Sequence, residues 1–120
     1  MTKTLHISND LENLIKKITI VDSGNGYIKF GDGTMVCYGS STTQNCSPGA
    51  TVFGISLPQT FINNSYTVSL SRSDGGANYA STLERILSKG NYYFEIYVWN
   101  DNQNVANSLQ FDYIAIGKWK

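Results

Sequence analysis

Leu109-Gln-Phe-Asp-Tyr-Ile-Ala-Ile-Gly-Lys-Trp-Lys120, the last twelve residues, decide the fold of this chain. Successive residues of a β-strand point to opposite faces. One face here is apolar throughout, with Leu109, Phe111, Tyr113 and Ala115. The other face starts polar, at Gln110 and Asp112, and becomes apolar at Ile114 and Ile116. A strand that is apolar on both faces is buried on both. Because 120 residues are too few to cover both faces, we expect a partner subunit over Ile114 and Ile116.

The composition indicates one domain with an uncharged polar surface. The formal net charge is zero, from 9 Lys+Arg and 9 Asp+Glu, so we expect no nucleic-acid partner. Only 15% of residues are charged, and Asn, Ser, Thr and 8 Tyr supply the polarity. No apolar run approaches the length of a membrane span, and the first residues lack the pattern of a signal peptide. A protein of this kind that acts outside a cell would be released by lysis.

The N-terminal segment carries an apolar repeat with the spacing of a heptad. Its members are Ile7, Leu11, Leu14, Ile18 and Val21. Asn9 and Glu12 resemble a capping box, and Lys16 and Lys17 suit a helix C-terminus, so residues 9–19 are predicted to be helical. Two interpretations are open: the helix packs on its own domain, or it ends a parallel coiled coil. We divide the chain into a helical stalk, 1–21, and a β-sandwich, 22–120.

Between the stalk and the closing strand, short apolar runs alternate with turn residues. Predicted strands are 27–30, 34–38, 51–57, 66–71 and 92–99. Asp32-Gly33 predicts a hairpin turn, since Gly33 accepts a positive φ. Residues 22–26, 72–78 and 100–104 are predicted turns, and 39–49 a polar loop. Residues 79–87 fit a strand or a helix equally well. The pattern predicts an all-β fold, an antiparallel sandwich of six to seven strands after a short helix.

Few residues suit catalysis or metal binding. The single histidine, His6, precedes the predicted helix, and no zinc or EF-hand spacing is present, so we expect no cofactor. Carboxylate pairs for glycoside hydrolysis would have to come from Asp101 with Asp112, or from Glu84 with Glu95. Acidic side chains on strands are usually solvated, and we expect no enzyme activity.

The two cysteines, Cys37 and Cys46, lie nine residues apart. A disulfide between them is sterically possible. Cys37 falls at the centre of a predicted strand, however, where a small buried side chain is the commoner role.

Three segments together resemble the C-terminal domains of bacteriophage tail fibres. Gly26-Tyr-Ile-Lys-Phe-Gly-Asp-Gly33 looks like the hairpin that opens these domains after a helical stalk. Val52-Phe-Gly-Ile-Ser-Leu-Pro58 is similar to their next strand, with Leu57 in place of the usual aromatic residue. Phe111 to Trp119 resembles their closing strand, so the likeness covers residues 9–120. These domains are similar to the H-type lectin fold, a trimeric six-stranded sandwich.

The resemblance implies a homotrimeric fibre tip, part of a virion, that recognises a polysaccharide of the bacterial surface. Two alternatives stay open. One is a structural cap that trimerises a fibre without contacting a receptor. The other is a small glycan depolymerase with an acidic pair between subunits.

The candidate sugar-binding residues surround the end of the strand 92–99. Aromatic rings stack on apolar sugar faces, while amide, carboxylate and guanidinium groups bond the hydroxyls. Trp99, Asn100 and Asp101 stand where that strand enters a polar loop, and Tyr97 shares a face with Trp99. In H-type lectins a Trp followed by a polar residue lines the sugar site at a similar place. The two arginines, Arg72 and Arg85, complete the candidate set. The competing interpretation is that these aromatic residues belong to a subunit interface.

Overall fold

The computed structural model describes residues 10–15, 18–73 and 82–120. Residues 10–15 and Ile18 are helical, and the rest forms nine strands within the described ranges. The strands are β1 (Ile20–Gly24), β2 (Tyr27–Phe30), β3 (Thr34–Ser40), β4 (Gln44–Cys46), β5 (Gly49–Ser56), β6 (Thr67–Ser73), β7 (Thr82–Lys89), β8 (Tyr93–Asn100) and β9 (Ala106–Lys118). All pairings are antiparallel, and the predicted all-β sandwich is confirmed. The described ranges hold nine strands in place of the predicted six to seven, because the predicted turn 22–26 and loop 39–49 also contribute strands.

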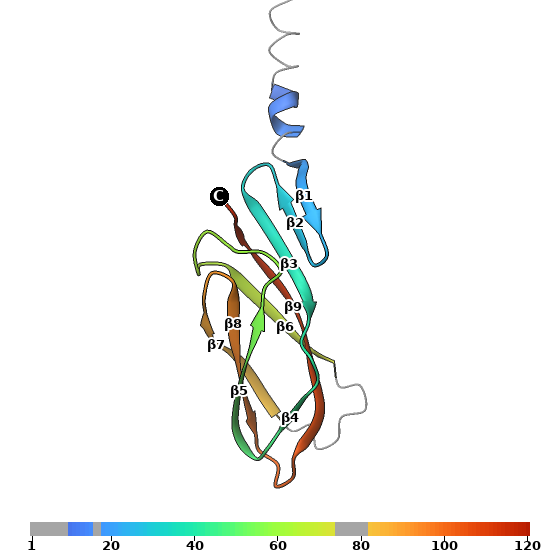
Figure 1. Ribbon diagram of the computed structural model, residues 1–120, viewed down its shortest axis with the longest axis vertical. Coiled ribbons are helices and arrows are strands. Elements are labelled where there is room, and N and C mark those ends of the chain that lie inside the picture. Colours follow the sequence, from blue (N-terminus) through green and yellow to red (C-terminus); the bar gives the residue numbers. More distant parts are fainter. Residues whose placement is uncertain (1–9, 16–17, 74–81) are drawn as a thin grey trace, which may run out of the picture.

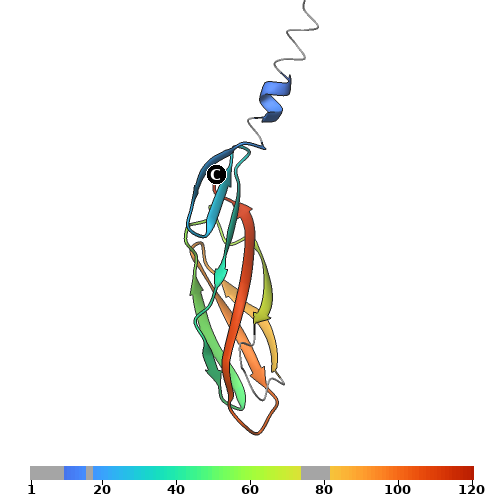
Figure 2. The same cartoon turned by 90° about the vertical axis from the view of Figure 1, so that its right-hand side faces the viewer.

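The closing strand β9 is the centre of the larger sheet. That sheet has the order β1-β2-β3-β9-β4, with β6 also paired to β9. β3 and β6 pair with the same stretch of β9, so they flank it on opposite edges. The smaller sheet, in the order β5-β8-β7, packs face to face against the larger one (Figures 1 and 2).

The core lies between β9 and β8. The predicted inner face of β9 is buried as expected, with Leu109, Phe111, Tyr113 and Ala115 all in the core. Phe94, Ile96 and Val98 of β8 are fully buried opposite them. The rings of Phe94 and Tyr113 meet edge to face, with centroids 5.2 Å apart. Each such side chain contributes about 1.5–3 kcal/mol on full burial, so this layer contributes strongly to the packing of the two sheets.

The described residues leave the other face of β9 half exposed. Ile114 and Ile116 are each 50% exposed. Cross-strand neighbours on this face are Tyr38 beside Ile114 and Val36 beside Ile116. We call Val36, Tyr38, Ile114 and Ile116 the outer apolar face of the larger sheet. Within the described residues, the prediction that both faces of β9 are not covered is confirmed.

The helix stands apart from the sandwich. Leu11, Leu14 and Ile18 are each more than half exposed. The helical residues extend beyond the end of the sheets where β1 begins (Figures 1 and 2). The interpretation in which this helix packs on its own domain is therefore wrong for the described residues. Ile7, Asn9, Lys16 and Lys17 lie outside them.

The predicted turn at 22–26 is mostly strand. β1 begins at Ile20, inside the segment assigned to the stalk, and pairs with β2 across the two-residue turn Asn25-Gly26. Gly26 has a φ of 88°. Asn-Gly with positive φ is the strongest short hairpin signal, so the sequence held this information. The second predicted hairpin, at Asp32-Gly33, is confirmed, with a φ of 95° at Gly33.

The predicted polar loop 39–49 contains regular structure. β3 continues to Ser40, β4 occupies 44–46, and β5 starts at Gly49. β4 is polar and three residues long, and it forms because the N-terminal end of β9 supplies a pairing partner. Local sequence does not reveal a partner 60 residues away. The expected small buried role of Cys37 is confirmed, and Cys46 is likewise free and buried.

The ambiguous segment 79–87 is strand from Thr82 onward, with 79–81 outside the described residues. The register of β7 against β8 shifts between Ile86 and Ser88, which is a β-bulge at Leu87. The bulge breaks the strict alternation and produces the apolar spacing that resembles a helical turn. Of the predicted turn 72–78, Arg72 and Ser73 belong to β6, and 74–78 lie outside the described residues.

Candidate functional site

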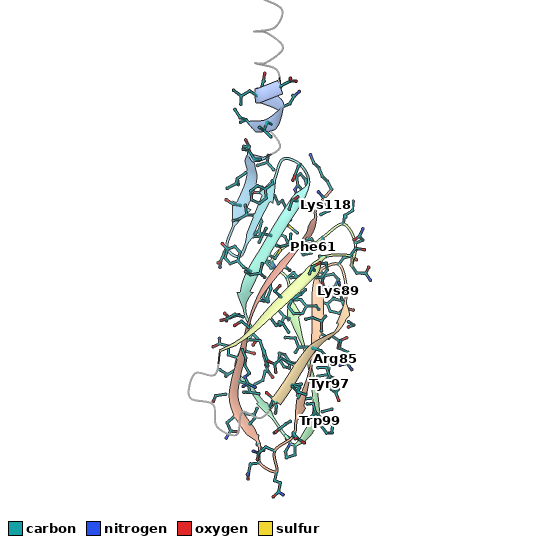
Figure 3. All side chains as sticks on the ribbon, turned by 180° about the vertical axis from the view of Figure 1, so that it is seen from behind. Phe61, Arg85, Lys89, Tyr97, Trp99 and Lys118 are labelled. Atoms are coloured by element: carbon teal, nitrogen blue, oxygen red, sulfur yellow. The ribbon has the colours of Figure 1, made fainter. Side chains whose placement is uncertain are left out.

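Three of the predicted ligand-binding residues come together on the outer face of the smaller sheet. Arg85 of β7 is directly opposite Tyr97 of β8, and Leu83 is opposite Trp99. Directly opposed residues of paired strands share a face. Figure 3 shows Arg85, Tyr97 and Trp99 in succession along these two strands.

Their side chains line a shallow pocket of about 270 Å³, with Leu83 and Glu84 completing the lining. We call it the Trp99 pocket. Leu83 is 75% exposed and Trp99 is 43% exposed, which is unusual for side chains of this size. The guanidinium of Arg85 stacks over the ring of Tyr97, 4.6 Å from its centroid. The pocket thus offers an aromatic and aliphatic floor with a cationic hydrogen-bond donor at one side.

Asn100 does not join this pocket. Its side chain is 1% exposed and points to the core side of β8, two residues after Val98. Nδ2 donates to the carbonyls of Cys46 and Asn104, and Oδ1 accepts from the backbone N–H of Asn102, each at 2.9 Å. Asn100 therefore anchors the loop after β8. The alternation of Phe94, Ile96 and Val98 is the signal that predicts this orientation.

Asp101 follows Asn100 and is exposed in that loop. It lies beyond the Trp99 end of the strand and does not line the pocket.

Arg72 also lies elsewhere. It is opposite Phe111 of β9, so its side chain is on the core side of β6. Its guanidinium donates to Oγ1 of Thr82, the first residue of β7. Arg72 thus links the larger sheet to the smaller one.

The two predicted carboxylate pairs are separated by the fold. Glu84 is opposite Val98 on the core side of β7, whereas Glu95 is on the outer face and accepts a 2.6 Å bond from Ser88. Asp112 is on the outer face of the larger sheet, where it accepts a bond from Ser40, while Asp101 follows a strand of the smaller sheet. His6 lies outside the described residues. Within the described ranges, no group of three or more His, Cys, Asp or Glu is placed to hold a metal ion.

The predicted oligomerisation residues are exposed wherever the structure describes them. Leu11, Leu14, Ile18, Val21, Ile114 and Ile116 each keep at least half of their surface accessible. Ile7 lies outside the described residues. Sequence reasoning missed Val36 and Tyr38, which complete the outer apolar face; their pairing with β9 was the information needed. None of the helical residues in the described ranges forms a helix long and apolar enough to span a membrane.

No family model and no curated protein matches the sequence. Solved structures do match the fold. An N-truncated R1-type pyocin tail fibre superposes with a TM-score of 0.71 at 16% identity, over 92% of this chain and 94% of the fibre chain. The chain has the fold of a pyocin tail fibre domain.

Two longer fibre fragments from P. aeruginosa, both C-terminal, carry the same fold. The R1 pyocin fibre gives a TM-score of 0.62 at 16% identity over 82% of this chain, and the R2 fibre 0.55 at 12% over 77%. This chain spans only 27% and 23% of the lengths of those two chains. The predicted similarity to the H-type lectin fold stays a prediction.

Proposed function

We propose that this chain is a domain of the tail fibre of a phage or a phage-tail-like particle. On this proposal it sits on the virion, is released with it by host lysis, and binds a glycan of the bacterial surface in the Trp99 pocket. It catalyses no reaction. The convergence of Trp99, Tyr97 and Arg85 in one exposed pocket, on a fold shared with pyocin tail fibres, carries the proposal.

The pocket suits a sugar because it combines two kinds of surface. A pyranose ring has an apolar C–H face that packs on an aromatic ring, and the exposed indole of Trp99 beside Leu83 provides such a platform. The hydroxyls around the ring need donors and acceptors, and Arg85 supplies donors that cannot lose their charge at physiological pH. A volume of about 270 Å³ accommodates one or two sugar residues.

We further propose that the domain works as a homotrimer. The outer apolar face and the exposed apolar side of the helix both lack a cover in the described part of this chain. A heptad repeat brings helices together along such a side, and a short helix of this kind is marginal alone in water. Light scattering or native mass spectrometry of the intact chain tests this: three times 13.3 kDa is expected, and a monomer contradicts it.

A structural cap that trimerises a fibre without touching a receptor is the second candidate, because the outer apolar face alone would serve that role. The two candidates differ in the importance of the Trp99 pocket. The cap predicts that Trp99→Ala leaves adsorption to host cells unchanged.

The binding proposal is tested on an array of bacterial lipopolysaccharides, capsular polysaccharides and wall teichoic acids. We expect the intact chain to bind at least one glycan, and Trp99→Ala to weaken that binding at least about tenfold. Tyr92→Ala is the matched control, because it removes an exposed aromatic ring (59% against 43% for Trp99) outside the pocket. Equal binding by both variants would overturn the assignment of the pocket. Release of reducing ends from a bound glycan would instead support a depolymerase.

A further inference from the structure

Arg85 is the group of the Trp99 pocket that is available to a charged ligand. Among the described residues, its guanidinium forms no hydrogen bond or salt bridge, and its one contact of note is the stacking on Tyr97. Stacking engages the face of the guanidinium plane. The N–H groups at its edge point outward in the plane and stay free to bond a ligand.

Neighbouring charged groups are engaged elsewhere or face away. Lys89, at the far end of β7, donates to the backbone carbonyl of Tyr66. Glu95, on the same face as Arg85, accepts the hydrogen bond from Ser88. Glu84 contributes to the lining of the pocket, but its side chain is on the core side of β7, opposite the buried Val98. Among the residues that line the pocket, Arg85 is the one whose charged group is on the outer face of the sheet, and a cation there favours an anionic ligand.

The spacing of the pocket fits a single acidic sugar. Arg85 and Tyr97 form one cross-strand row, and Leu83 and Trp99 form the next row on the same face. Rows on one face of a strand are two residues, about 7 Å, apart. A pyranose ring lying on Trp99 would place an exocyclic anionic group at the guanidinium. Planar bidentate bonding of two oxygens is the geometry in which arginine exceeds lysine.

We propose that the sugar recognised in the Trp99 pocket carries an anionic oxygen group, held by Arg85 while the ring stacks on Trp99. The inference rests on the proposed glycan-binding function and specifies its ligand class. The anionic group is either the carboxylate of a uronic acid or the phosphate of a phosphorylated glycan, and both present paired oxygens to the guanidinium.

The test measures equilibrium binding of the intact chain to four probes. These are a uronic-acid polysaccharide, the same polysaccharide after carboxyl reduction, a wall teichoic acid, and neutral dextran. We expect tight binding to the uronic-acid polymer or the teichoic acid, and at least tenfold weaker binding to both neutral probes. If carboxyl reduction of the uronic-acid polysaccharide abolishes its binding preference, the anionic group of the ligand is a carboxylate. If the chain prefers the teichoic acid, the anionic group is a phosphate.

Variants connect the preference to Arg85. Arg85→Gln should lower binding of the preferred acidic probe by about tenfold to a hundredfold, and Arg85→Lys should recover only part of the loss. Lys118→Gln removes a charge at the distant end of β9 and should have no effect (Figure 3). If neutral and acidic glycans bind alike and Arg85→Gln changes neither, the acidic-sugar inference is wrong while glycan binding stands. If no glycan binds at all, both proposals fail.

Discussion

Replacing Asn100 with alanine separates two roles for this residue. The sequence makes it a candidate sugar ligand, and the structure makes it the anchor of the loop after β8. Its amide makes three hydrogen bonds at 2.9 Å while only 1% exposed. Asn100→Ala leaves the carbonyls of Cys46 and Asn104 and the N–H of Asn102 without these partners.

The size of the effect follows from these contacts. Each group left unsatisfied in a buried place costs about 1–3 kcal/mol. The Asn102 and Asn104 groups are near the loop surface, where water can replace the amide, so the Cys46 carbonyl dominates. We expect the free energy of unfolding to fall by about 1–3 kcal/mol.

The assay is denaturant unfolding of wild type and Asn100→Ala at one protein concentration, together with glycan binding under conditions where both are folded. We expect a lower unfolding midpoint and a dissociation constant within about threefold of wild type. Asp101→Ala is the control, since its side chain is exposed in the same loop. A variant as stable as wild type that no longer binds glycan would refute the anchor role and restore Asn100 as a ligand.

Two further predictions concern the outer apolar face and the buried thiols. Ile116→Asp places a charge on the half-exposed outer apolar face and should convert the trimer to monomer in native mass measurements. Thr67→Asp, beside Ile116 on β6 at the edge of the sheet, should weaken the trimer less. A trimer retained by Ile116→Asp would contradict the proposed interface. Burial raises the pKa of the Cys37 thiol to about 11, so the folded chain keeps a proton that the unfolded chain loses above about pH 8.5. Stability should therefore be level near pH 7–8 and fall as the pH rises toward 11, in urea unfolding measured across that range. Cys37→Ala should show a shallower fall, and an identical pH profile would count against a protonated buried thiol.

Period-two alternation was enough to predict the parts of the fold that bury a continuous apolar face. The inner face of β9 and the run from Phe94 to Val98 were predicted residue by residue, because each alternating position is also a core position. The same alternation placed Tyr97 and Trp99 together on the outer face. Arg85 is a candidate from the sequence only because it is one of two arginines. Its position opposite Tyr97 could not be predicted without the pairing register of β7 against β8.

Features that depend on partners distant in the chain could not be predicted in this way. β4 forms against residues of β9 about 60 positions later, and the bulge at Leu87 disguises β7 as a helical pattern. Arg72 is polar and is the first residue of the predicted turn 72–78, yet pairing with β9 puts it on the core side, where it donates a hydrogen bond to Thr82. The turn Asn25-Gly26 is different, because its hairpin signal is local and is present in the sequence, although the prediction for 22–26 is a simple turn.

The most direct test of glycan binding at the Trp99 pocket uses the two tryptophans of the chain. Each indole N–H gives one signal in a ¹H–¹⁵N NMR spectrum, and Trp119 serves as an internal control because its Nε1 donates to the carbonyl of Phe30 in the other sheet. The titrant is an oligosaccharide of the glycan that binds on the array. The account predicts that the Trp99 signal shifts progressively to saturation while the Trp119 signal stays in place. Saturable binding that leaves the Trp99 signal unmoved would contradict it.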